Sequence, residues 1–288
     1  MSWLGYMRDI FGELLRLTPS FRGKWRLERY WANRLKPNEQ RIAVLPDGSR
    51  LRVNLDIGYE RMIWLQQEEW DELVHLNREL KPGDVFIDVG ANIGLWTLVA
   101  ASSVGPTGHV FSFEPNPSTY TKLKENVGMN CRERVVTAMP YAASDRNAAA
   151  WFSCPKNHSL SAIATDVTDR TDLVEVRTTT IDSLLQDAPQ LDRVVGLKID
   201  TEGHELSTLH GAAGVIRRLS PWLIVEFNTT LLDSRLMEDW PVYSFLCERN
   251  YCPFLYDSNS QTPVDGKFAL DGYCNILFQK KPASSRVT

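Results

Sequence analysis

Ionisable side chains gather directly after one apolar run of the sequence. Asp200, Glu202 and His204 follow residues 194–199. In an open α/β sheet the carboxyl ends of the strands form the ligand crevice, so these side chains are expected to reach a site. There a carboxylate or an imidazole could take the proton of a substrate hydroxyl, with Asp200 as the first candidate, followed by His204 and Glu202. The alternating spacing would also suit a divalent metal, although we do not expect one.

Two further residues are candidates for the substrate side of this site. Lys198 lies inside the apolar run and needs an acidic partner there, for which Glu226 on the next strand is the candidate. His158 lies in a polar stretch, 156–170, between two short strand-like runs. Long loops in compact domains often carry function, so His158 could line a substrate entrance.

A glycine-containing turn, DVGANIG at 88–94, follows the first strand of the pattern. Gly90 and Gly94 would let the backbone approach a ligand closely, and free N–H groups at the start of the next helix could bind an anionic group. The spacing differs from the G-x-G-x-x-G of nicotinamide-dinucleotide folds, which disfavours a nicotinamide-dependent oxidoreductase. Asp88 would repel a phosphate and favours a ligand that carries an ammonium group.

Acidic residues also follow the next two strands. Glu114 comes after residues 110–113, where a carboxylate can accept hydrogen bonds from two ribose hydroxyls. Asp145 ends the sequence AASD after a third strand at 135–142. An amide and a carboxylate at that point could lie beside an adenine edge, although this signal is weak by itself.

Taken in order, these motifs resemble the class I, Rossmann-like methyltransferases that use S-adenosylmethionine. The segments IDVGANIG, FEPNP, TTTIDSLL, LKIDTEGHE and WLIVEF are specifically similar to the FkbM family of methyltransferases, over about residues 81–280. The resemblance implies that Asp145 binds the adenine amino group, that Glu114 binds the ribose and that Asn116 lines the adenosine pocket. The residues that it implies for the methionine end of the cofactor are Asp88, Gly90, Asn92 and Gly94.

The same resemblance implies the reaction. FkbM-like enzymes include those that methylate hydroxyls of saccharides and polyketides, so we expect O-methylation of such a small-molecule or glycan acceptor. The protein supplies orientation while the cofactor carries the difficult chemistry. The alternative is a catalytically silent subunit or scaffold that keeps the cofactor pocket.

Apolar strands and helical stretches alternate over the rest of the chain, which predicts an α/β fold with a mostly parallel, seven-stranded, Rossmann-like sheet covered by helices on both faces. The last two strands have only a loop between them and should pair antiparallel. Residues 148–154 and 173–180 would form a hairpin insertion. The predicted strands are 85–89, 110–113, 135–142, 194–199, 223–227, 251–256 and 273–278, and the helices 95–103, 117–129, 205–219 and 242–249.

The composition is that of an ordinary globular protein. The chain has 288 residues, of which 43% are apolar and 24% charged, and this excludes the disordered, collagenous and disulfide-scaffold classes. Its five scattered cysteines predict reduced thiols of a cytoplasmic protein. No run of apolar residues is long enough for a signal peptide or a spanning helix.

An accessory segment, 1–80, should precede the methyltransferase domain at 81–280 and a polar tail at 281–288. It begins with an amphipathic helix at 3–17 and continues with two short strands in 41–55 and a long helix at 59–80. Residues 1–40 carry eight basic and four acidic side chains, a balance of +4 that leaves −8 for the remainder. The helix at 3–17 would pack on the main domain or a second subunit, or contact a membrane surface peripherally. No nucleic-acid partner is expected.

Overall fold

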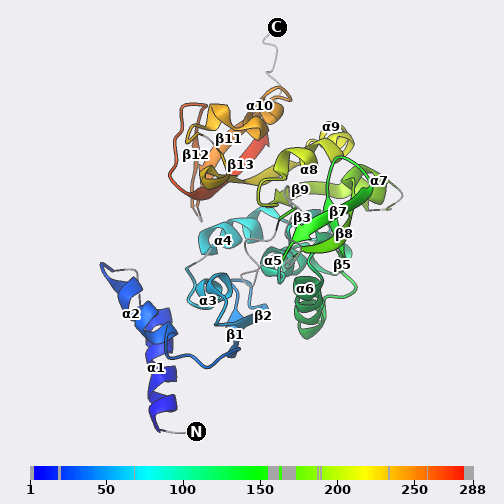
Figure 1. The fold of residues 1–288 in the computed structure, drawn as a ribbon. Helices are drawn as coiled ribbons and strands as arrows, with labels where there is room; N and C mark the ends of the chain where they lie inside the picture. The colour runs from blue at the N-terminus through cyan, green and yellow to red at the C-terminus, as the bar shows by residue number, and fades with distance from the viewer. Residues whose placement is uncertain are drawn as a thin grey trace.

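The computed structural model describes residues 3–18, 21–67, 69–154, 162–163, 173–186, 188, 190–232, 234–257 and 259–281. His158 lies outside these residues. Within them no helix is both long and apolar enough to cross a membrane. Figure 1 shows a twisted central sheet with helices packed against it and a pair of helices, α1 and α2, at one edge of the molecule.

The main sheet has eight strands in the order β12-β11-β13-β10-β9-β3-β4-β5. The five neighbours from β5 to β10 are parallel, whereas β13 is antiparallel to both β10 and β11. This confirms the mostly parallel sheet and the antiparallel end, and a three-residue edge strand, β12, is the eighth. The strands are β3 Val85–Val89, β4 His109–Phe113, β5 Val136–Met139, β9 Val194–Ile199, β10 Trp222–Asn228, β11 Tyr251–Tyr256, β12 Gln261–Pro263 and β13 Tyr273–Lys280.

Helices cover both faces of this sheet, because alternate side chains of a strand point to opposite faces. On β3, Phe86 belongs to one apolar cluster, with side chains of α4, α5 and α6, whereas Ile87 belongs to a second, with α7 to α10. Both faces are therefore apolar, as predicted. The helices are α1 Trp3–Leu17, α2 Lys24–Ala32, α3 Gly58–Trp64, α4 Trp70–Glu79, α5 Leu95–Val104, α6 Pro117–Met129, α7 Ile181–Leu185, α8 Glu205–Gly211, α9 Ala213–Leu219 and α10 Pro241–Cys247.

Three expected elements are each divided in two. The helix predicted at 59–80 is interrupted between α3 and α4, where Gln66 and Glu69 adopt φ values of 60° and 53° that end helical geometry. The helix predicted at 205–219 breaks at Ala212. The strand predicted at 135–142 breaks at Pro140, which has no N–H for a sheet ladder.

That last break builds a second sheet beside the first. After Pro140, β6 (Tyr141–Ala143) leaves the main sheet and pairs parallel with β8 (Leu173–Thr179). β8 also pairs antiparallel with β7 (Ala148–Ser153), so the predicted hairpin insertion is confirmed. The short sheet therefore brings the region after the third strand back over the carboxyl ends of the main strands.

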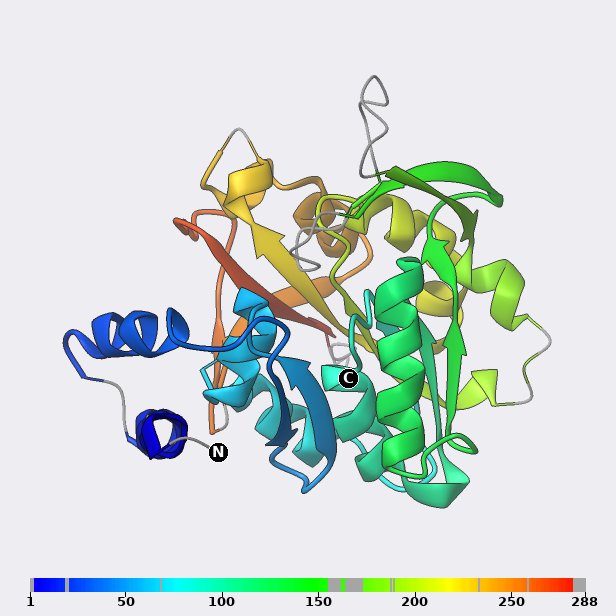
Figure 2. The ribbon, with the colours of Figure 1, turned by 60° about the horizontal axis from the view of Figure 1, so that its bottom comes forward.

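The N-terminal segment packs on the main domain through its hairpin and through α3 and α4, and its first two helices attach to α3. The expected hairpin of β1 (Gln40–Val44) and β2 (Arg50–Asn54) is confirmed, and the N–H of Arg52 donates to Asn126 Oδ1 of α6 at 2.9 Å. Helices α1 and α2, which we call the arm, attach through Trp31, whose ring stacks on Trp64 at a centroid distance of 5.3 Å. Figure 2 shows the arm lying beside the body rather than within it.

Candidate active site

The carboxyl ends of the parallel strands open into a cavity of about 490 Å³. Five polar side chains of its lining form a row, because each lies on or just after a different one of five neighbouring strands. Glu114 follows β4, Asn92 follows β3 and Asp200 follows β9, while Glu226 lies on β10 and Asn275 on β13. Neighbouring strands lie about 4.8 Å apart, so the four steps from β4 to β13 span roughly 19 Å. The cavity is therefore long enough to receive two ligands side by side.

Gly90, Ala91, Asn92 and Glu114 form the part of the lining that we call the turn wall. The N–H groups of Gly90 and Ala91 both donate to the Phe113 carbonyl, at 3.0 and 2.9 Å, which ties the turn to β4. Gly90 has φ +80°, and a Cβ atom there would lie 1.8 Å from the Asp200 carbonyl oxygen. Only glycine can therefore occupy this position, and the ligand-facing backbone is held rigidly.

Glu114 is buried and holds the turn wall together. Its Oε2 accepts from the Asn92 N–H and its Oε1 from the Asn116 N–H, both at 2.8 Å. Burial raises the pKa of this carboxyl to about 7, although the two backbone N–H groups oppose the shift. Each carboxylate oxygen keeps a further lone pair, so Glu114 can also accept from a ligand hydroxyl.

Three of the seven predicted cofactor residues line the cavity: Gly90, Asn92 and Glu114. The Oδ1 atom of Asn92 is buried and has no hydrogen-bond partner among the described residues. It is therefore available to a donor group of a ligand.

The other four predicted cofactor residues are not part of the cavity lining. Asp88 is fully buried on the side of β3 that faces α5, where its Oδ2 accepts from Thr97 Oγ1 at 2.6 Å. Burial raises the pKa of this carboxyl to about 6. Gly94, with φ +102°, is the N-cap of α5. Asn116 caps α6 by accepting from the Ser118 N–H at 3.0 Å.

Asp145 is the fourth of these residues. It is exposed and pairs with Arg146 at 3.0 Å, and this hydrogen bond lowers the pKa of its carboxyl. Backbone direction and helix capping thus place these four residues beside the cavity rather than in its lining.

The three predicted catalytic residues all line the cavity, but two of them already have partners. Lys198 Nζ donates to Asp200 Oδ2 at 2.8 Å, and a ring nitrogen of His204 lies 2.9 Å from Ser144 Oγ. The expected pairing of Lys198 with Glu226 is wrong, because the register places Lys198 opposite Ile224, two residues before Glu226. Burial acts to lower the pKa of Lys198, yet the nearby carboxylates, Asp200 first, raise it above its ordinary value.

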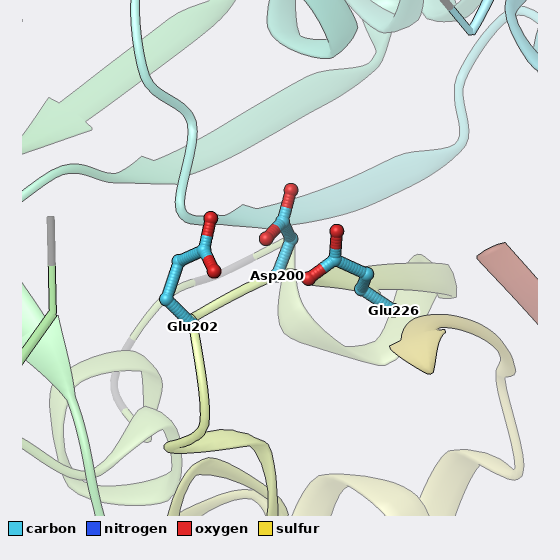
Figure 3. Close-up of side chains that lie close together, drawn as sticks. All are labelled: Asp200, Glu202 and Glu226. Atoms are coloured by element: carbon cyan, nitrogen blue, oxygen red, sulfur yellow. The ribbon is translucent and has the colours of Figure 1, made fainter. Parts of the chain in front are cut away.

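Asp200, Glu202 and Glu226 converge in the middle of the row and form what we call the carboxylate cluster (Figure 3). One oxygen of each lies within 4.8 Å of the others, so these three could hold a divalent cation; Glu226 takes the place that the sequence suggested for His204. Burial raises the pKa of Glu202 to about 8 and that of Glu226 to about 10, and the charge of Asp200 adds to both shifts. A Glu226 oxygen is buried without a partner.

Several polar lining residues were missed by the sequence motifs, and four of them form one end of the cavity. Tyr59, Glu69, Tyr273 and Asn275, which we call the outer wall, come from α3, the turn before α4, and β13. Their spacing along the chain carries no signal, since they are separated by up to 216 positions. The left-handed backbone of Glu69 is also unusual for a non-glycine residue and cannot be read from the sequence.

Residues 88–252 match the family described as Methyltransferase FkbM domain, which covers more than half of the chain. The chain belongs to this family. The FkbM methyltransferase predicted from the motifs is thereby confirmed. The matched range contains the turn wall and the carboxylate cluster, whereas all four residues of the outer wall lie outside it.

Relatives of this FkbM methyltransferase differ in how much of it they cover. The hexuronic acid methyltransferase AglP of Haloferax volcanii is 28% identical over 197 residues, which are 67% of this chain and 78% of that protein. Methyltransferase 1 of Beauveria bassiana is 26% identical over 148 residues, 45% of this chain and 59% of its own. The solved structure of methyltransferase FkbM from Methylobacillus flagellatus KT is 15% identical, with a TM-score of 0.43, and covers 94% of this chain and 59% of that one.

Proposed function

We propose that this methyltransferase uses S-adenosylmethionine to methylate a hydroxyl group of a saccharide or a similar small-molecule or glycan acceptor. The observation that carries the proposal is the row of side chains across one cavity. The turn wall stands at one end, unpaired carboxyl groups stand in the middle, and a polar outer wall stands at the other end. The relative named as a hexuronic acid methyltransferase supports a saccharide as the acceptor class.

The turn wall fits the proposed cofactor. Gly90 lets the turn backbone lie directly against the Asp200 carbonyl, the unpartnered Asn92 Oδ1 can accept from an ammonium group, and Glu114 can accept from ribose hydroxyls. S-adenosylmethionine would supply an activated methyl group at this place.

Glu202 is our leading candidate for the group that takes the acceptor's proton. Asp200, first in the sequence-based ranking, is engaged by Lys198, and His204 is engaged by Ser144. Glu202 has no hydrogen-bond partner among the described residues, and its pKa of about 8 suits a base near neutral pH. Asp200 would then orient the acceptor and keep Lys198 charged.

A transfer assay with S-adenosylmethionine labelled in its methyl group tests the proposal. We expect label in a saccharide such as D-glucuronic acid or D-glucose and a transfer rate about 100-fold lower when Glu202→Gln replaces the wild type, while S-adenosylhomocysteine still binds by calorimetry. An Asp71→Asn variant is the matched control, because Asp71 is an exposed acid outside the cavity. Tight binding of S-adenosylhomocysteine without transfer to any acceptor would instead favour a silent subunit.

A further inference from the structure

We infer that the outer wall is the acceptor-binding surface and that Glu69 is the residue that positions it; this rests on the proposed function. The outer wall belongs to the accessory segment and to the last strand, on either side of the range matched by the family. It can therefore differ between members that share the cofactor end of the cavity.

Glu69 ties together three elements that are distant in the sequence. Its Oε1 accepts from Trp96 Nε1 of α5 and from Asn275 Nδ2 of β13, both at 3.0 Å. Its Oε2 accepts from the Tyr59 hydroxyl of α3 at 2.9 Å. Hydrogen bonds to an ionised carboxylate are the stronger kind, so one side chain fixes Tyr59 and Asn275 at once.

The outer wall continues directly into the carboxylate cluster. Asn275 and Glu226 are opposite each other in the β10–β13 pair, and opposed residues of an antiparallel pair share one face of the sheet. Trp96, which Glu69 also binds, lies under the Lys198 ammonium at 5.4 Å from the ring centroid. A ligand on the outer wall would thus reach the groups that are proposed to take its proton.

Two buried oxygens on these opposed residues lack partners. Asn275 Oδ1 and Glu226 Oε2 have no hydrogen bond among the described residues, although both residues line the cavity. Buried polar atoms almost always have a hydrogen-bond partner, so two unpaired oxygens on opposed residues indicate that a ligand donates hydrogen bonds to them. Hydroxyl groups of an acceptor are donors of the right kind for an amide oxygen and a carboxyl oxygen.

The remaining side chains of this end also suit a polyhydroxylated ligand. Tyr59 donates its proton to Glu69, and Asn228 and Thr230 add polar groups to the lining. Tyr273 is 53% exposed and adds an aromatic side chain to the lining. Aromatic side chains together with amides and hydroxyls suit a polyhydroxylated ligand better than a purely apolar one.

Glu69→Gln tests the inference by separating the two ligands. The amide oxygen can still accept from Trp96 and Asn275, but its NH₂ group must donate to the Tyr59 hydroxyl, so that bond reverses and all three lose the carboxylate acceptor. Because neutral hydrogen bonds are weaker than those to a carboxylate, we expect the KM for D-glucuronic acid or D-glucose to rise about tenfold, while the Kd for S-adenosylhomocysteine changes less than about twofold. Asp71→Asn, an exposed acid-to-amide change two residues away, should leave both values unchanged.

Tyr59→Phe is a second test in case the Glu69 variant does not fold. It removes only the hydroxyl that donates to Glu69. It should raise the acceptor KM in the same direction by a smaller factor. An acceptor KM that both folded variants leave unchanged, or a parallel loss of S-adenosylhomocysteine binding, would overturn the role of the outer wall while leaving the methyl transfer intact. Should wild type transfer no label to a saccharide and give no ligand-detected NMR signal with either sugar, the proposed function and this inference would both fail.

A different observation carries a second proposal, which concerns the arm. Among the described residues, eleven large apolar side chains are exposed, and seven of them lie between Met7 and Tyr30. Four of the seven recur along one stripe of α1, at Met7, Ile10, Leu14 and Leu17. The opposite side of α1 packs on α2, where a Cβ atom at Gly12 would lie 2.6 Å from Trp31.

We propose that the arm docks on an anionic lipid surface. Residues 21–36 contain six basic side chains and one acidic side chain, a local charge of +5. A symmetric pairing of two arms would bring these like charges near each other, whereas anionic headgroups complement them. The exposed rings of Phe21 and Tyr30 are of the kind that sits at headgroup level.

Flotation of the full chain with vesicles tests this docking. We expect co-flotation with vesicles of phosphatidylcholine and phosphatidylserine at least about fivefold above pure phosphatidylcholine, and loss of the excess in Leu14→Gln/Leu17→Gln and in Arg26→Glu/Arg29→Glu. Val44→Gln, an exposed apolar residue on β1, should float like wild type. Equal partition into both vesicle types, or a dimer in sedimentation velocity that the same substitutions dissolve, would contradict the lipid surface.

Discussion

The two ends of the cavity are built in different ways. The turn wall comes from a continuous stretch between β3 and α6, and backbone N–H groups and glycine geometry hold it. The outer wall comes from α3, the turn before α4, and β13, and one carboxylate joins its side chains. If the two walls bind the cofactor and the acceptor as proposed, cofactor binding depends on a local stretch of the sequence, whereas acceptor binding depends on contacts between distant segments.

The largest expected effect breaks the turn wall. Gly90→Ala would force a Cβ atom onto the Asp200 carbonyl oxygen and strain a backbone with φ +80°, so we expect a loss of about 3 kcal/mol or more in the free energy of unfolding and no measurable S-adenosylhomocysteine binding. Gly48→Ala is the control, because Gly48 has φ +86° but open space around it, and about 1 kcal/mol is expected there. Denaturant unfolding and calorimetry measure both variants; equal losses would show that steric contact with Asp200 is unimportant.

A second prediction sharpens the contrast between the two walls. Glu114→Gln places an amide NH₂ against the backbone N–H of Asn92 or Asn116, so the turn wall loses a bond and its charge. We expect the Kd for S-adenosylhomocysteine to rise about 30- to 100-fold, and the acceptor KM to stay within about threefold. This is the mirror image of Glu69→Gln. Calorimetry and transfer kinetics on the two variants decide, and a shared pattern would mean that the walls do not act separately.

The middle of the row should determine the pH dependence. With a Glu202 pKa of about 8, kcat/KM should rise about tenfold per pH unit below that value and level off above it, because the carboxylate takes the proton. Glu202→Gln should abolish this limb, and an unchanged profile would assign the proton to another group. The free energy of unfolding changes in the opposite direction. Between the ordinary Glu202 pKa of 4.5 and the folded-state pKa of about 8, the folded protein keeps a proton on Glu202 that the unfolded protein loses. The contribution of Glu202 to stability therefore falls as the pH rises across this range and is lost above about 8.

The smallest expected change in cofactor affinity concerns Asp88. The motif assigns this residue to the cofactor, but its side chain is buried against α5 and is not part of the cavity lining. Asp88→Asn keeps the shape of the side chain and an oxygen for the Thr97 hydroxyl. We expect the Kd for S-adenosylhomocysteine to change less than about threefold, because Asp88 does not line the cavity. Calorimetry would support a direct cofactor role only if affinity fell as far as in Glu114→Gln.

Much of the fold could be predicted, since strands and helices of the main domain follow from apolar periodicity. The breaks within elements were not predicted: Pro140 is visible in the sequence, but the left-handed backbone of Glu69 accompanies side-chain contacts with α3, α5 and β13 that the sequence does not show. Of the residues predicted for the site, those at a strand's carboxyl end, such as Glu114 and Asp200, line the cavity. Asp88 and Asn116 do not, because the Asp88 side chain accepts from Thr97 inside the fold and the Asn116 side chain caps α6.

The sequence by itself determined the family, the α/β alternation and the turn wall, because glycine geometry and strand-end acids are local properties that short motifs record. Only the tertiary structure decided which acid Lys198 pairs with, that Glu226 joins Asp200 and Glu202, and that Glu69 links α3, α5 and β13. These depend on strand register and on contacts between residues up to 206 positions apart. Such contacts form only when the sheet brings its strands side by side.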